Sequence, residues 1–179
     1  MTDAPHLWTD LAIERLEKHH DRTSFACGNA DIDEHLKRFA RQGDERSTTR
    51  TYVLVERGSA TVLGYYAIRA GTLILDELPL EQRKRLPRYP VPTVHLARMG
   101  VDATFRSHQG KGRHLGQLLL FHGFRSTLHV ADALGIFAMD VVAIDERAAD
   151  FYRRHGFVPL LDRPMHMFMT TAAIRSLLA

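Results

Sequence analysis

The sequence has one cysteine and no long apolar run, and each shortage excludes a class of protein. Cys27 is the only cysteine among 179 residues, which excludes an internal disulfide and leads us to expect a reducing, cytoplasmic location. No apolar run approaches the roughly 18 residues that a membrane-spanning helix needs, so we expect no membrane partner. The first residues lack a basic stretch followed by an apolar core, so we expect no secretory signal.

Metal-binding motifs are also missing, although the chain contains 11 histidines. Neither an H-E-x-x-H motif nor a Cys/His ligand spacing occurs, so we expect no metal and interpret the histidines as scattered surface or core residues. Cys27 precedes Gly-Asn at a predicted helix start, a position that can lower the pKa of a thiol. Because no His–Asp partner set is evident nearby, we favour a buried structural thiol.

A glycine-rich basic segment at residues 106–120 is the most informative part of the chain. The glycines allow close backbone approach to a ligand, and the following apolar pattern predicts a helix whose N–H groups and dipole favour an anion. The spacing fits neither a P-loop, because Arg113 and His114 follow Gly112, nor a dinucleotide fingerprint, because the glycines are spaced too widely. We predict a pyrophosphate site of another kind, with an ordinary surface loop as the alternative.

The overall composition is that of a globular protein with one well-cored domain. Apolar residues make up 45% and charged residues 25% of the chain, and the net charge of +3 permits an anionic partner such as a nucleic acid without requiring one.

Hydrophobic periodicity predicts a mixed α/β domain. Residues 10–20 form an amphipathic segment at the start of the domain. Asn29 is expected to cap a helix over 31–41. The other expected elements are strands at 51–56, 62–68 and about 71–75, a proline-rich basic loop at 81–92, a strand at 94–101, a helix at 115–134, a doubly buried strand at 136–144, a helix at 146–155 between Asp145 and Gly156, and final strands at Phe157 and 165–170.

This order of elements, with the strand 94–101, the glycine segment and the motif at 145–157, resembles the GNAT superfamily of acyl-CoA-dependent N-acetyltransferases. Five further motifs resemble one branch, the GNAT toxins of bacterial toxin–antitoxin pairs; they are Phe25–Asp33, Gly64–Tyr66, Leu86–Pro92, Leu96–Asp102 and Pro164–Phe168. The resemblance implies that residues 1–179 form a single GNAT domain, an α/β (α+β) fold whose mixed central sheet is splayed between its central strands and flanked by helices.

The resemblance also implies acetyl-CoA as cosubstrate. The backbone of Met99, Gly100 and Val101 would bind the pantetheine arm. The pyrophosphate would bind at the loop and helix start that the family writes Q/R-x-x-G-x-G/A. The sequence departs from that pattern, and two registers remain: one begins at Gln109, and the one we favour begins at Lys111 and has His114 where glycine is expected. In the favoured register the site comprises Lys111, Gly112, Arg113, His114, Leu115 and Gly116.

By the same resemblance, Tyr152 is the general acid that protonates the leaving thiolate, although periodicity alone favours packing against Phe151. Val101 is the expected N–H donor to the carbonyl oxygen. Asp102 and Asp145 are candidate general bases, and each is equally a strand-end or capping residue. Arg98 either orients substrate or phosphate or forms an ordinary salt bridge.

Basic residues lie in two clusters; such charge runs are usually solvated faces, but the resemblance connects them with tRNA phosphates. The first cluster comprises Lys37, Arg38, Arg41, Arg46 and Arg50, and the second comprises Arg83, Lys84, Arg85 and Arg88. We interpret the chain as a toxin that acetylates the α-amine of aminoacyl-tRNA, blocks translation and is neutralised by a ribbon-helix-helix antitoxin, with a homodimer left open. The alternatives are a GNAT enzyme that acetylates a small-molecule or protein amine, and a non-catalytic module that binds CoA or nucleic acid.

Overall fold

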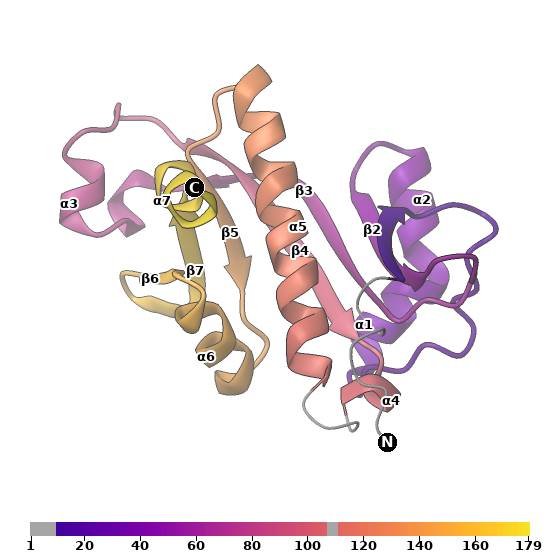
Figure 1. Cartoon of the computed structure of the whole chain (residues 1–179). Coiled ribbons are helices and arrows are strands. Elements are labelled where there is room, and N and C mark those ends of the chain that lie inside the picture. Colours follow the sequence, from indigo (N-terminus) through magenta and orange to yellow (C-terminus); the bar gives the residue numbers. More distant parts are fainter. Residues whose placement is uncertain (1–9, 107–110) are drawn as a thin grey trace. The chain divides into compact units, whose positions relative to one another are not determined.

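A computed structural model describes residues 10–106 and 111–179, which fall into two compact units (Figure 1). Unit 1 contains residues 10–68 and the segment Arg98–His122, and unit 2 contains Arg69–Ala97 and Gly123–Ala179. The strands belong to one seven-stranded mixed sheet in the order β1-β2-β3-β4-β5-β7-β6. This architecture of a mixed sheet with helices confirms the predicted α/β class.

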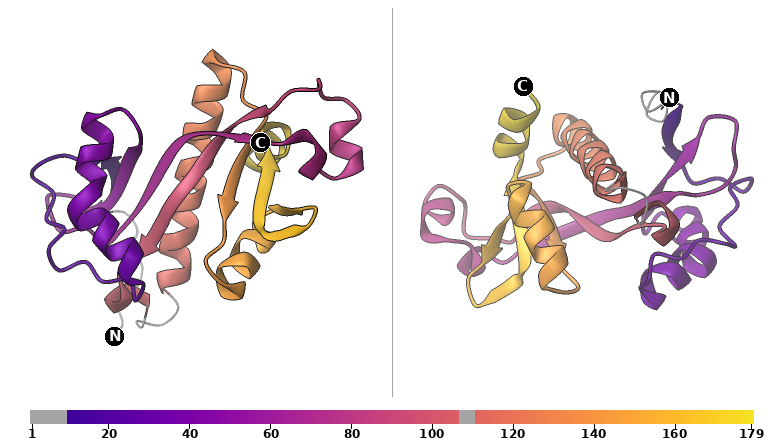
Figure 2. Two further views of the ribbon diagram at one scale, coloured as in Figure 1. Left: turned by 180° about the vertical axis from the view of Figure 1, so that it is seen from behind. Right: turned by 60° about the horizontal axis from the view of Figure 1, so that its bottom comes forward.

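In unit 1, antiparallel strands pack against a helical segment. β1 (Leu11–Arg15) pairs with β2 (Arg50–Glu56), which pairs with β3 (Gly64–Leu73). α1 (Ala30–Glu34), the π-helical turn η2 (His35–Phe39) and α2 (Ala40–Glu45) follow one another without a break and lie along one face of these strands (Figure 2). The unit's core forms where one stripe of this helix meets the inward face of the strands; it includes Ile32, Leu36, Ala40, Val53, Val55, Tyr65 and Ala67.

Local signals in unit 1 are partly confirmed. The Asn29 side chain accepts a hydrogen bond from the Ile32 N–H, as predicted for the helix cap. The amphipathic start at 10–20 contains β1, whose alternating Leu11 and Ile13 serve an edge strand paired with β2. The two strands expected at 62–68 and 71–75 form the single strand β3.

In unit 2, three neighbouring strands form the part of the sheet that concerns the sites below. The residues Thr93–Leu96 of β4 (Val91–Val101) pair in parallel with β5 (Ala138–Val142), and β5 pairs antiparallel with β7 (Arg163–Thr170). β6 (Val158–Leu160) adds to β7, and α7 (Thr171–Leu178) follows it. β5 is buried over Ala138–Val141, which confirms the prediction of a strand covered on both faces.

The connection between β3 and β4 contains the short turn η3 (Leu75–Glu77) and α3 (Leu80–Arg83). The prolines keep the following segment irregular, as predicted, but β4 begins at Val91 and includes Pro92, whose carbonyl accepts a hydrogen bond from the Phe137 N–H. The expectation that residues 81–92 form neither regular helix nor strand was therefore wrong at both ends, because α3 extends to Arg83 and β4 begins at Val91.

Three further helices follow β4. α4 (Ala103–Arg106) is a single turn, α5 extends over Lys111–Ala133, and α6 (Glu146–Arg154) is capped by Asp145, whose side chain accepts from the Ala148 N–H. Gly156 adopts a positive φ of 97° just after the C-cap residue His155 of α6, which confirms the predicted helix end. α5 begins at Lys111, four residues earlier than predicted. Among the residues that the structure describes, no helix combines the length and apolarity needed to cross a bilayer.

Candidate functional site

The predicted pantetheine-binding strand lies at the end of β4 in unit 1. Val101 is buried, and Met99 and Gly100 are half-buried. A Cβ atom on Gly100 would lie 2.8 Å from Cγ2 of Ile32 and 3.3 Å from Sγ of Cys27, so only glycine lets α1 approach the strand this closely. The role of Met99, Gly100 and Val101 in binding acetyl-CoA stays a prediction.

The predicted pyrophosphate residues Lys111–Gly116 form the first turns of α5, so most of the expected loop is helix. A helix start presents unpaired N–H groups, which is the arrangement that binds phosphate. His114 is exposed, whereas Leu115 and Gly116 are buried. Gln109 and Gly110, on which the alternative register depends, lie outside the described residues.

Asp102 acts as a connector of backbone segments. One carboxylate oxygen accepts from the Ala26 N–H at 3.0 Å, and the other accepts from the Thr104 N–H at 2.9 Å. Its own N–H donates to the Leu63 carbonyl. These contacts favour the strand-end interpretation of Asp102 over that of a general base.

Arg98 forms an ion pair with Asp31 of α1, with 3.1 Å between Nη2 and Oδ2. This contact favours the salt-bridge interpretation of Arg98. His35 of η2 stacks on Tyr65, with ring centroids 6.3 Å apart and an interplanar angle of 11°. Burial, together with the positive charge of Arg98, lowers the pKa of His35, while Asp31 opposes the shift. The periodicity at 31–41 predicted one regular helix and gave no sign of the π-helical turn that carries His35.

Tyr152, the predicted general acid, lies on α6 in unit 2 and is only 6% exposed. Its ring meets Phe151 and Phe157 edge-on, with centroids 5.4 Å away in each case. Burial raises the pKa of the phenol, so Tyr152 is protonated at neutral pH and can donate a proton. The predicted stripe Ala148–Phe151–Tyr152 needs one correction: Ala149 and Tyr152 are the buried positions, and Ala148 and Phe151 are half-buried.

Cys27 is a buried thiol whose surroundings are structural. Its N–H donates to Oδ1 of Asp33 at 2.8 Å, and its sulfur lies 3.7 Å from the Asn29 carbonyl oxygen. These contacts tie the cysteine to the start of α1, in agreement with the structural interpretation.

Carboxylates neutralise part of each basic cluster. In the first cluster Arg38 pairs with Glu34, Arg41 with Glu45, and Arg50 with Asp44. In the second, Arg83 pairs with Asp76 at 3.6 Å and Lys84 with Glu81 at 2.9 Å. Among the described residues, no ion pair engages the remaining members, which are Lys37, Arg46, Arg85 and Arg88. These four charges are therefore the ones free to meet an anionic partner.

From the sequence we expected the histidines to be scattered, but some of them lie close together in the structure. Atoms able to bind a metal gather at two places in the described part of the chain: Glu14, His19 and His20, and separately His95, Asp140 and His166. Neither group was predicted, because its members come together only through the fold.

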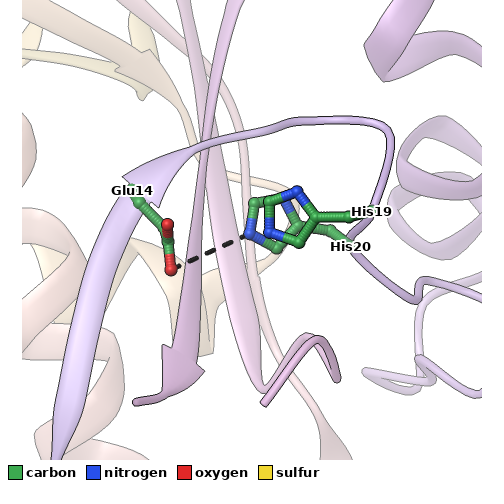
Figure 3. A group of neighbouring side chains, drawn as sticks. All are labelled: Glu14, His19 and His20. Atoms are coloured by element: carbon green, nitrogen blue, oxygen red, sulfur yellow. Dashed lines mark ion pairs between the residues drawn. The ribbon is translucent and has the colours of Figure 1, made fainter. Parts of the chain in front are cut away.

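The group in Figure 3 is a histidine–carboxylate pair rather than a metal site. The Glu17 N–H donates to Nδ1 of His20 at 2.9 Å, so the ring's own proton is on Nε2, which faces Oε1 of Glu14 at 3.9 Å. A metal ion on Nε2 would displace that proton to Nδ1, where it would collide with the Glu17 N–H. Burial and the neighbouring His19 lower the pKa of His20, in keeping with a neutral ring.

Comparisons with known proteins cover nearly the whole chain. No protein-family model matches it. It is 30% identical over 175 residues to a probable toxin TacT of Sinorhizobium fredii, and the alignment covers 93% of this chain and 94% of the relative. It is also 30% identical over 167 residues to a tRNA-acetylating toxin of Mycobacterium tuberculosis, covering 93% and 96% of the two chains.

Solved structures agree with these relatives and confirm the predicted GNAT fold. A tyrosine-to-phenylalanine mutant of KacT matches with a TM-score of 0.86 and 29% identity, over 94% of this chain and 99% of that one. AtaT complexed with acetyl-methionyl-tRNAfMet matches with a TM-score of 0.85 and 28% identity, over 95% and 100%. The chain therefore belongs to the family of GNAT toxins of toxin–antitoxin systems.

Proposed function

We propose that the chain is an acetyl-CoA-dependent N-acetyltransferase that acetylates the α-amine of aminoacyl-tRNA and thereby blocks translation. The observation that carries this proposal is the match to AtaT, a protein solved with acetyl-methionyl-tRNAfMet, over 95% of this chain. The similarity to a tRNA-acetylating toxin over 93% of the chain supports the same activity.

The proposal includes the partners that such a toxin requires. AtaTR has been solved with acetyl-CoA, and AtaT with the C-terminus of the antitoxin AtaR, which supports acetyl-CoA as the acetyl donor and an antitoxin as the inhibitor. The sequence resemblance assigns this antitoxin to the ribbon-helix-helix class. The cytoplasm is the compartment, because aminoacyl-tRNA is found there. Residues 1–179 act as one GNAT domain, in which β3, β4 and α5 each contribute residues to both units.

In the proposed reaction, the protein positions the amine next to the thioester and supplies one proton to the leaving thiolate. The amine nitrogen attacks the thioester carbonyl, and the Val101 N–H stabilises the oxyanion. As the carbon–sulfur bond breaks, Tyr152 donates its phenolic proton to the thiolate. The nitrogen loses one proton as the amide forms, and this proton returns through solvent to the Tyr152 phenolate, which regenerates the acid. The α-amine of an aminoacyl ester is unusually acidic for an amine, so it arrives neutral without a strong base. The capping contacts of Asp102 and Asp145 fit this account.

The activity is tested with labelled acetyl-CoA and four acceptors: total aminoacyl-tRNA, the same tRNA after deacylation, a panel of free amines, and a protein with accessible lysines. We expect label in the aminoacyl-tRNA alone, released with the amino acid when the ester is hydrolysed. Transfer to free amines or protein in preference to aminoacyl-tRNA would replace this proposal with the small-molecule or protein alternative. Tight acetyl-CoA binding without any transfer would indicate a non-catalytic module.

A further inference from the structure

A buried carboxylate in unit 2 lies between two histidines that come from neighbouring strands. His95 of β4 is directly opposite Asp140 of β5, and Asp140 is opposite Phe168 of β7, two residues from His166. Side chains alternate between sheet faces with a period of two, so all three point to the same face. The three strands thus bring together residues that are up to 71 positions apart, from 95 to 166.

Both imidazoles contact the same carboxylate oxygen. Nδ1 of His95 lies 2.7 Å and Nε2 of His166 lies 2.8 Å from Oδ2 of Asp140. Burial by itself would raise the pKa of Asp140, but the hydrogen bonds from His166, His95 and Thr93, with the charge of His95, together hold it at about 2. The carboxylate is therefore anionic at neutral pH, the form that binds a cation.

Neighbouring groups hold the Asp140 carboxylate in one orientation, as hydrogen-bonding residues around a metal site orient its ligands. The Thr93 hydroxyl donates to Oδ1 of Asp140 at 2.5 Å, which leaves Oδ2 for the two histidines. A Cβ atom on Gly71 would lie 2.7 Å from Oγ1 of Thr93, 2.9 Å from Cβ of His95 and 3.3 Å from Oδ1 of Asp140. The glycine of β3 therefore leaves the space that the cluster occupies.

We propose that His95, Asp140 and His166 bind one divalent transition-metal ion of the Zn²⁺ class through Nδ1, Oδ2 and Nε2. Two imidazoles and a carboxylate are a ligand set that such ions prefer, with water in the fourth position. The three ligand atoms lie within 4.8 Å of one another, and each imidazole nitrogen needs to move away from Oδ2 by only about half an ångström to reach the roughly 3.3 Å ligand spacing of a tetrahedral site.

Metal binding here needs only a shift of tautomer. Each neutral imidazole carries one ring proton, which moves from the nitrogen facing Asp140 to the opposite one: Nε2 in His95 and Nδ1 in His166. The two side chains are 15% and 13% exposed, so the relocated protons can meet water. In neither ring does a backbone N–H of the described residues hold the ligating nitrogen, in contrast to His20 in Figure 3.

The site is tested by titrating the full chain, without a histidine tag and freed of metal by chelation, with Zn²⁺ in a calorimeter and with Co²⁺ in a spectrophotometer. We expect one equivalent to bind, with the intense visible absorption of four-coordinate Co²⁺ and a rise in Tm. His166→Gln should weaken binding at least 100-fold, and Thr93→Val by about 10- to 100-fold, because the latter removes only the hydrogen bond that orients the carboxylate.

His19→Gln is the matched control, because it alters the other histidine group while leaving this one intact; it should bind Zn²⁺ as the wild type does. Circular dichroism and acetyl-CoA binding confirm that each variant is folded. The proposal is overturned if the wild type binds no stoichiometric Zn²⁺, or if binding survives His166→Gln and Thr93→Val but is lost in His19→Gln. In the first case the cluster is a hydrogen-bond network only; in the second the metal binds at the group of Figure 3.

Discussion

Tyr152 is the residue on which the proposed chemistry depends most, and its surroundings limit it to one role. A phenol whose pKa is raised by burial cannot serve as a base at neutral pH, but it can donate a proton to a thiolate. The ring contacts with Phe151 and Phe157 hold the side chain in one orientation. Packing and catalysis are therefore compatible explanations of this tyrosine, and a substitution that keeps the ring separates them.

Tyr152→Phe should lower kcat by about 100- to 10,000-fold while leaving the melting temperature and acetyl-CoA affinity near those of the wild type. The ring is retained and only the proton donor is removed. Initial rates at saturating acetyl-CoA distinguish chemistry from binding. A variant with full turnover would show that Tyr152 is a packing residue and that another group protonates the thiolate.

Asp140 should make the protein sensitive to acid. Its pKa in the folded state, about 2, lies below the ordinary value of 3.8, so its contribution to stability is present above about pH 4 and is lost as the pH falls toward 2. The shift corresponds to about 2 kcal/mol. Urea unfolding of wild type and Asp140→Asn in chelator-containing buffer should show the stability difference shrinking by about that amount between pH 5 and pH 2. A difference that does not change with pH would contradict it.

At the level of single elements, α6 shows how a cap and a catalytic carboxylate can be distinguished. The Asp145 side chain accepts from the Ala148 N–H at 2.7 Å, and this bond begins the helix that carries Tyr152. An asparagine can make the same bond without a charge, whereas alanine cannot.

Asp145→Ala should therefore lower the free energy of unfolding by about 1 kcal/mol, whereas Asp145→Asn should cost much less and keep near-normal kcat. Urea denaturation and steady-state rates on the two variants provide the measurements. If Asp145→Asn is stable but loses most of its turnover, Asp145 acts as a base and the capping interpretation fails.

The elements that could be predicted from sequence are those whose cause is local. Asn29, Asp145 and Gly156 act within one helical turn, so their positions alone indicated where helices begin or end. β1 was missed because its strand character depends on pairing with β2, whose partner residues lie from 37 positions away (Arg15 with Tyr52) to 45 positions away (Leu11 with Glu56). The early start of α5 was missed because glycines at 110, 112 and 116 argue against helix.

At the scale of the whole molecule, charge pairing decides which basic residues can meet a nucleic acid. Arg83 and Lys84 already contact carboxylates, whereas Arg85 and Arg88 have no ion-pair partner among the described residues. The sequence showed four equivalent charges in this cluster. The structure divides them into two neutralised and two free.

Replacing Arg85 and Arg88 by alanine should weaken tRNA binding and reduce the slope of log K against log salt by about one for each lost phosphate contact. The double replacement of Arg83 and Lys84 is the matched control and should change both quantities less. Filter binding at several salt concentrations, with acetyl-CoA affinity as a folding check, measures the contrast. Equal effects from the two pairs would show that the intrachain ion pairs do not matter.

The candidate sites show the same limit of sequence reasoning. Motif resemblance identified Met99–Val101, the start of α5 and Tyr152, because the family pattern is written along the chain. No pattern along the chain joins His95, Asp140 and His166, since strand pairing alone makes them neighbours. Each of the three has apolar neighbours in sequence, and a single polar residue in an apolar strand does not indicate which distant residue it will contact.

The interleaving of the two units imposes an order on biosynthesis. Unit 1 needs residues up to 122, and unit 2 needs residues up to 179, although its first segment begins at 69. During translation, the strand Met99–Val101 and the start of α5 therefore leave the ribosome well before Tyr152. A nascent or prematurely terminated chain that ends after α5 contains every residue proposed to bind acetyl-CoA and lacks the residue proposed to complete the transfer, so in this account an unfinished chain cannot acetylate aminoacyl-tRNA.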